Sequence, residues 1–207
     1  LYLSTTFTKT SMRRSKRLAK KKRVNYGEDA MFEAMLAKQG AKGAKAQAAV
    51  FEEPVRPEHI EAMALVKDQV NIPIATGEML YGKHAFLDLL SRRAADIVQP
   101  DICLCGGFAE CLFVAELARL WGVFCAPHCW AGAIVNSATI HLLSVLPNSS
   151  WARTTETPML ELDVTENPFR DEIVSEPIQV KDGFVDGPKG PGLGIEILED
   201  VLRHYAV

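Results

Sequence analysis

The stretch "ADIVQPDICLCGGFAECLFVAELARLWGVFCAPH", residues 95–128, sets a long amphipathic run between two short apolar runs. The short runs end in Asp101 and His128, and the long run carries apolar residues at the three- and four-residue spacing of a helix. A short buried strand, a helix and another short strand are typical of parallel βα alternation. This stretch therefore predicts a parallel sheet whose strands are connected by helices.

The same unit occurs four times in succession, and each strand-like run ends in a polar residue. These residues are Glu52, Glu78, Asp101 and His128, at intervals of 26, 23 and 27 residues. In a (β/α)₈ barrel the carboxyl ends of the strands surround one mouth, so four such residues would converge there. A doubly wound open sheet is the alternative, but only the strand ends at its switch point face a common ligand. The nearly constant interval favours the barrel.

The length of the chain limits how much of a barrel it can form. With 207 residues and 48% hydrophobic composition, the chain suits one domain with its own core. A (β/α)₈ barrel of typical size needs about 250 residues, whereas the pattern here supports five strands at most. We therefore expect a partial TIM barrel of the α/β class, with unpaired edge strands that favour association into a homo-oligomer.

The first 27 residues differ from the rest in charge. They hold nine Lys or Arg and no acid, which leaves 23 − 9 = 14 basic against 26 acidic residues in 28–207. We expect a disordered basic tail at 1–27 and a globular domain at 28–207. The run "RRSKRLAKKKR" leaves binding to nucleic acid or to an acidic partner as an alternative. A solvated arm is the favoured interpretation, because no aromatic side chain interrupts the run.

The remaining composition favours a cytoplasmic protein. The sequence contains no apolar run of about 18 residues and no secretory signal pattern, so it predicts neither a membrane span nor export. The five cysteines cluster between positions 103 and 129, which is typical of free thiols in a reducing compartment.

The four strand-end residues are suited to metal-assisted proton transfer. Glu52 and Glu78 would repel each other at one mouth unless a cation lay between them, and carboxylates bind hard ions such as Mg²⁺. His128 could act as a base towards a substrate carboxylate's neighbouring carbon, and Asp101 could orient its imidazole by accepting the other N–H. The sequence thus predicts a Mg²⁺ site beside a His-Asp pair.

The segment "GVFCAPHCW", residues 122–130, offers a competing metal site. Cys125, His128 and Cys129 could be soft ligands for zinc. A structural zinc site needs four ligands, however, and no fourth soft ligand accompanies these three in the sequence. We therefore interpret the cysteines as small packing residues.

The motifs "FEEP", "GE", "QPD" and "PH", in this order, resemble the mandelate racemase and muconate lactonizing enzyme branch of the enolase superfamily. Together with "LELDVTENPFRDE" and "GPGLGIEI", the resemblance covers about residues 46–207 and is closest to the acid-sugar dehydratases. It implies that Glu52, rather than Glu53, and Glu78 are the second and third Mg²⁺ ligands. It also implies that Asp101 and His128 form the dyad that moves the α-proton. Glu161 would be the acid of the last strand that binds the substrate carboxylate or assists the electrophile.

The chain departs from the family pattern at the first metal ligand. That ligand is an aspartate one βα unit before Glu52, but the corresponding place holds Tyr26 beside Asn25, and Glu28 and Asp29 are out of register. The family's catalytic lysines and capping domain would precede residue 1. Two functions therefore remain open: a sugar-acid dehydratase or racemase (a lyase or an isomerase), or a truncated, non-catalytic remnant of such an enzyme.

Overall fold

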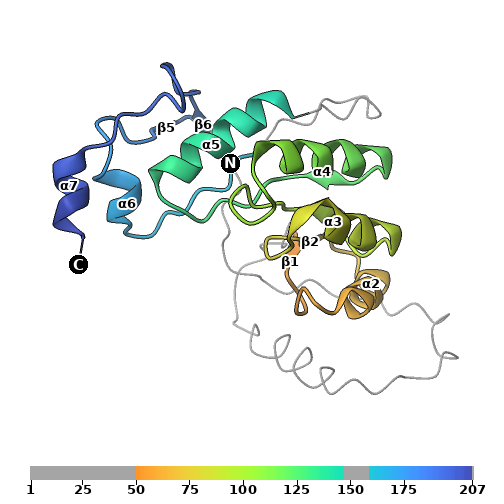
Figure 1. Cartoon of the computed structure of the whole chain (residues 1–207). Coiled ribbons are helices and arrows are strands. Elements are labelled where there is room, and N and C mark those ends of the chain that lie inside the picture. Colours follow the sequence, from red (N-terminus) through yellow and green to blue (C-terminus); the bar gives the residue numbers. More distant parts are fainter. Residues whose placement is uncertain (1–49, 147–158, 207) are drawn as a thin grey trace, which may run out of the picture.

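The computed structural model describes residues 50–146 and 159–206 (Figure 1). The predicted basic tail, the missing first ligand around Asn25 and Tyr26, and the segment 28–49 lie outside the described residues. Within the described residues, no helix is both long and apolar enough to cross a membrane.

A parallel sheet organises the first part of the described chain. Its strands are β1 (Phe51–Glu52), β2 (Ile74–Thr76), β3 (Ile97–Val98) and β4 (Phe124–Cys125), and they lie side by side in chain order. All three pairings are parallel, and they place Glu52 opposite Ala75 and Val98 opposite Cys125. The predicted α/β class with a parallel sheet is confirmed, and the partial barrel stays a prediction.

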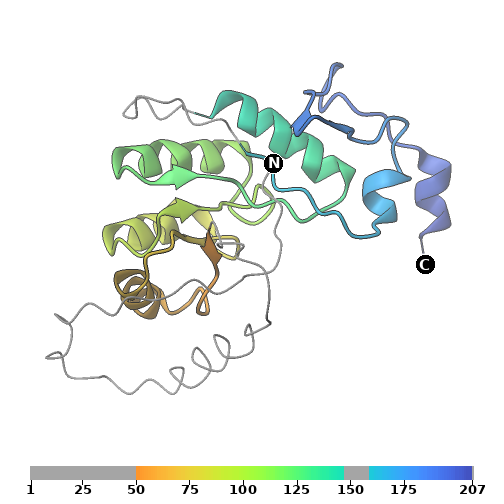
Figure 2. The same ribbon diagram turned by 180° about the vertical axis from the view of Figure 1, so that it is seen from behind.

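One helix follows each strand. These are α2 (Ile60–Gln69), α3 (Gly82–Ser91), α4 (Phe108–Leu120) and α5 (Ala133–Val145). They follow one another across the molecule in both views (Figures 1 and 2). Buried Phe86 and Leu89 of α3 and Val114 of α4 share a core cluster with Ile74 and Val98 of the sheet. The apolar residues at helical spacing therefore form the interface that fixes each helix on the sheet.

The C-terminal part lies beyond α5 in both views and contains only short elements. These are α6 (Pro168–Asp171), β5 (Val180–Lys181), β6 (Phe184–Val185) and α7 (Glu199–His204). Leu160 packs with Cys129 and with Ile140 and Leu143 of α5, and Ala133 at the start of α5 packs with Ile173 and Val174. These two clusters attach the C-terminal part to α5.

The parallel strands bring the predicted residues to one edge. Glu52 is the last residue of β1, Glu78 follows β2 by two residues, and Asp101 and His128 follow β3 and β4 by three. Because neighbouring strands run in the same direction, their carboxyl ends share an edge of the sheet. The predicted placement of the four residues is confirmed.

Candidate active site

The imidazole of His128 and the carboxylate of Asp101 are in direct contact. Nδ1 of His128 lies 2.9 Å from Oδ2 of Asp101. The other oxygen, Oδ1, accepts the backbone N–H groups of Cys103 and Leu104 at 2.7 and 3.1 Å. The tight turn after β3 therefore fixes the carboxylate before it meets the imidazole. The predicted contact is confirmed, while its catalytic role stays a prediction.

Electrostatics assign the protons of this pair. Burial alone would raise the pKa of Asp101, but the contact with His128 and the two backbone N–H groups outweigh it and lower the pKa. Burial alone would lower the pKa of His128, but Asp101, Glu161 and Glu78 outweigh it and raise the pKa. An ionised Asp101 can only accept a hydrogen bond, so Nδ1–H donates to it. The lone pair of the neutral imidazole then lies on Nε2, which is 3.5 Å from Oε2 of Glu78.

Glu78 reaches this position through a glycine. Gly77 has φ of 124°, in the region that favours glycine, and a Cβ there would lie 2.7 Å from the ring of Phe86. The pKa of Glu78 is raised by burial, and the charges of Glu52 and Glu161 oppose the lowering effect of His128. Glu78 therefore lies among other carboxylates as well as beside the imidazole.

Glu52 is held by a residue for which the sequence predicted no role. Nε2 of Gln99, which follows β3, donates a short hydrogen bond to Oε1 of Glu52. The side chain of Gln99 is almost completely buried, and its Oε1 has no partner among the described residues. This contact spans from β3 to β1 past the intervening strand. The only sequence signal was the place of Gln99 in the "QPD" motif.

The extended backbone of β1 ends at Glu53. Its φ of 42° ends the extended backbone of β1, so alternation no longer decides where its side chain points. Its Oε1 accepts the hydroxyl of Thr76 at 2.8 Å and the backbone N–H of Gly77 at 2.9 Å. Burial raises the pKa of Glu53, and nearby Glu78 and Glu52 add to this. Glu53 thus ties the end of β1 to the backbone that leads to Glu78.

Glu161 joins the group from the segment beyond α5. It is buried, with 8% of its surface exposed, and its Oε2 accepts the backbone N–H of Cys129 at 2.9 Å. Burial raises the pKa of Glu161, against the lowering effects of this N–H and of His128. The structure therefore brings Glu161 to the same region as the four strand-end residues.

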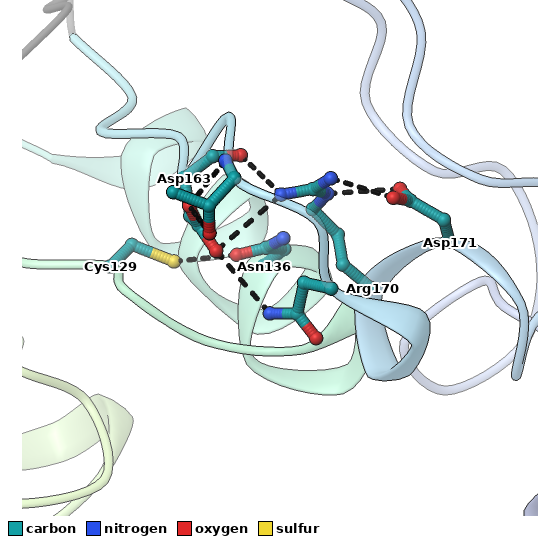
Figure 3. Close-up of polar contacts among 7 residues, drawn as sticks. Cys129, Asn136, Asp163, Arg170 and Asp171 are labelled. Atoms are coloured by element: carbon teal, nitrogen blue, oxygen red, sulfur yellow. Dashed lines mark hydrogen bonds and ion pairs between the residues drawn. The ribbon is translucent and has the colours of Figure 1, made fainter.

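Cys129 belongs to the packing of this region. Its Sγ lies 2.9 Å from Oδ1 of buried Asn136 in α5 (Figure 3). Burial raises the pKa of the Cys129 thiol to about 12, so the sulfur stays protonated at neutral pH. Cys129 also packs with Leu160 and with Ile140 and Leu143 of α5. This supports the interpretation of Cys129 as a packing residue.

The donors at this edge fit a divalent cation as a pair of carboxylates. Glu52, Glu161 and Asp101 each raise the pKa of Glu78, which is the repulsion that a bound cation relieves. Within 50–146 and 159–206, no three or more Asp, Glu, His or Cys side chains are arranged to hold a metal by themselves. A cation held by Glu52 and Glu78 would need further ligands from water or substrate, and the role of these two residues as metal ligands stays a prediction.

Known proteins match most of the chain. The family model described as enolase C-terminal domain-like matches residues 28–201. The D-galactarolactone cycloisomerase of Agrobacterium fabrum is 41% identical over 155 residues, which cover 75% of this chain and 41% of that protein. The arabinonate dehydratase of Saccharolobus solfataricus is 32% identical over 155 residues, covering 75% of this chain and 39% of that protein.

A solved structure agrees with these matches. The 3,6-anhydro-D-galactonate cycloisomerase of Zobellia galactanivorans superposes with a TM-score of 0.69 and 38% identity, over 77% of this chain and 43% of that one. The chain thus spans about two fifths of the length of the curated relatives that it matches.

Proposed function

Because the chain belongs to the enolase C-terminal domain-like family, we propose that it acts in Mg²⁺-dependent abstraction of the α-proton of a sugar acid. Dehydration of the acid is the favoured outcome, and racemisation is the alternative. One observation carries the proposal: Nδ1 of His128 contacts Asp101 at 2.9 Å, while Nε2 faces the carboxylate of Glu78. An oriented base beside a cluster of acids is what this reaction needs.

The proposal includes the fold around the site. Residues 28–207 form the C-terminal part of a (β/α)₈ barrel, and the described sheet supplies consecutive strands of it. The chain order of the four parallel strands supports this, as does the superposition on a relative of about twice the length. The edge with Glu52, Glu78, Asp101 and His128 would then be the mouth of the barrel.

His128 removes the proton through Nε2. The electron pair of the broken C–H bond moves into the substrate carboxylate and forms an enediolate. In dehydration, the β-hydroxyl takes the proton from the imidazolium and leaves as water, while the enediolate electrons form the new C=C bond of an enol, which tautomerises to the keto acid. Racemisation would need a second acid on the opposite face of the same carbon to return a proton, a role that the resemblance gives to the lysines expected before residue 1. Asp101 stabilises the imidazolium in both cases.

Three acids share the remaining tasks. Glu52 and Glu78 would hold the divalent cation, whose charge stabilises the enediolate when it is bound. Glu161 donates a hydrogen bond to the substrate carboxylate when protonated, which its raised pKa favours. Gln99 donates to Oε1 of Glu52, which leaves Oε2 of that carboxylate for the cation.

The names of the relatives suggest the substrate class. One is a cycloisomerase of D-galactarolactone, one a dehydratase of arabinonate, and several are D-galactonate dehydratases. Aldonates, aldarates and their lactones share a carboxyl carbon next to a carbon that bears both a hydrogen and an oxygen. We therefore expect the substrate to come from these classes.

Proton exchange tests the proposal. The protein is incubated with Mg²⁺ and a panel of these acids in D₂O, and loss of the α-proton signal is followed by NMR. We expect exchange with at least one acid, and we expect His128→Asn to abolish it. His84→Asn, on the exposed face of α3, is the matched control and should leave exchange unchanged. Absence of exchange with every acid would favour the alternative of a non-catalytic remnant.

A further inference from the structure

Two segments far apart in the sequence meet at Cys129, the residue after His128. The first is the loop after β4, which carries His128, Cys129 and Gly132. The second runs from Glu161 to α6. They touch where the N–H of Cys129 donates to Oε2 of Glu161 at 2.9 Å. This hydrogen bond sets where the Glu161 carboxylate lies relative to the imidazole.

Gly132 permits a second, closer approach between these segments. A Cβ on Gly132 would lie 2.7 Å from the backbone oxygen of Phe169 in α6 and 3.3 Å from its carbonyl carbon. The φ and ψ of Gly132, −78° and 179°, are accessible to any residue. The position therefore needs glycine for space, because the backbone of α6 occupies the place of a side chain.

A buried acid holds the second segment in shape. Asp163 is only 2% exposed, and its Oδ1 accepts both the backbone N–H and the hydroxyl of Thr165, at 2.8 and 2.7 Å. Its Oδ2 lies 3.5 Å from Nη1 of Arg170, which also donates to the backbone oxygen of Asp163 at 2.5 Å. Figure 3 shows Arg170 between Asp163 and Asp171. The carboxylate thus folds the chain from 163 to 170 back on itself.

These contacts form one continuous support. Asp163 is two residues after Glu161. Its partner Arg170 is adjacent to Phe169, whose backbone lies against Gly132. Gly132 is in turn three residues after Cys129. A shift of α6 therefore moves the backbone of Glu161 relative to the N–H that its carboxylate accepts. Among the described residues, Gly132, Asp163 and Arg170 form no hydrogen bond or ion pair with the imidazole of His128 or the carboxylates of Glu52 and Glu78.

We propose that Gly132 and the Asp163–Arg170 pair are positioning residues that hold the Glu161 carboxylate on the N–H of Cys129. The catalytic consequence rests on the proposed function, whereas the positioning itself does not. Displacing a catalytic group by about 1 Å can lower the reaction rate by up to about 100-fold. Residues that fix the position of the Glu161 carboxylate therefore affect the rate of the proposed reaction.

The test inserts a methyl group at the point of closest approach. Gly132→Ala forces α6 away, whereas Gly187→Ala adds the same methyl group where nothing lies within 4 Å and is the matched control. The readout is the ¹H–¹⁵N resonance of the Cys129 amide in the protein without substrate. We expect an upfield proton shift in Gly132→Ala, towards the position in Glu161→Gln, and no shift in Gly187→Ala.

A second variant keeps the proposal testable if Gly132→Ala does not fold. Asp163→Asn retains the shape of the side chain and an acceptor for Thr165 but loses the charge that attracts Arg170. We expect the Cys129 resonance to move in the same direction by a smaller amount, and α-proton exchange to fall about 10- to 100-fold. A lower melting temperature with an unmoved Cys129 amide in the folded variants would overturn the positioning role. Absence of exchange in the parent protein would affect only the proposed function.

Discussion

Two aspartates flank strand β3, and their partners differ. Asp96 precedes the strand and binds the backbone N–H of Ile74 at 2.9 Å and the ammonium of Lys67 at 3.0 Å. Asp101 follows the strand and binds the imidazole of His128 at 2.9 Å. Asp96 is paired with the permanent cation of Lys67, and Asp101 with an imidazole that can gain or lose a proton.

The same difference separates the two edges of the sheet. At the amino edge, the charge of Asp96 is balanced by a side chain of α2. At the carboxyl edge, within the described part of the chain, no Lys or Arg forms an ion pair with Glu52, Glu78 or Asp101. Among the described residues, the partner and not the residue type therefore distinguishes Asp96 from Asp101.

The largest expected effect concerns the two aspartates themselves. Asp101→Asn should lower α-proton exchange by about 10²- to 10⁴-fold, because the base loses its orienting carboxylate. Asp96→Asn should leave exchange nearly unchanged, since it lies at the other edge. Both are measured by NMR in D₂O under identical conditions. Equal losses in the two variants would remove the distinction between the edges.

A smaller effect is expected at the metal ligand. Gln99→Leu removes the donor to Glu52 without a large change of volume, and should weaken Mg²⁺ binding about 10- to 100-fold, as loss of a supporting hydrogen bond typically does. Gln69→Leu, exposed at the end of α2, is the control. Isothermal titration calorimetry measures both. Unchanged affinity in Gln99→Leu would show that Gln99 does not orient a ligand.

The pH dependence follows from the raised pKa of His128. Protonated His128 stabilises the fold fully below the unfolded pKa, about 6.5, and this contribution is lost as pH rises through the higher folded pKa. Asp101→Asn should lower the pKa of His128 in the folded protein, because the carboxylate that opposes the effect of burial is removed. Asp96→Asn should leave the pKa of His128 unchanged. An NMR titration of the imidazole carbon signals measures both. A higher pKa in Asp101→Asn would contradict the assigned electrostatics.

The smallest effect is expected at the amino edge. Lys67→Met removes the cation from Asp96, whose side chain is 41% exposed, and should cost about 0 to 1 kcal/mol of unfolding free energy. The N–H of Ile74 keeps its acceptor and limits the loss. Urea unfolding measures the change, with exchange activity retained. A loss of activity in this variant would mean that the two edges are coupled.

The strand ends could be predicted from the sequence because each βα unit is a local pattern. The apolar runs before Asp101 and His128 set two neighbouring parallel strands, and the contact between these side chains follows from that placement. The resemblance to the enolase superfamily added Glu161, which no local pattern distinguishes from other acids of the C-terminal part.

The supporting contacts could not be predicted in the same way. Gln99 meets Glu52 across the intervening strand β2, a contact between side chains that no spacing in the sequence indicates. Glu53 escapes strand alternation because its backbone turns to a positive φ. Gly132 resembles an ordinary helix start, and only the packed α6 backbone reveals why no side chain fits there.

The chain order of the strands has a consequence for how the molecule assembles on the ribosome. Phe51 pairs with Ile74, Ala75 with Ile97, and Ile97 with Phe124, so each new pairing closes a loop of 22 to 27 residues. Loop closure of similar length costs a similar entropy at each step, so within the described sheet no strand waits for a distant segment. We therefore expect these four strands to pair in order from β1 to β4 as synthesis proceeds, with the Glu161 segment docking after them.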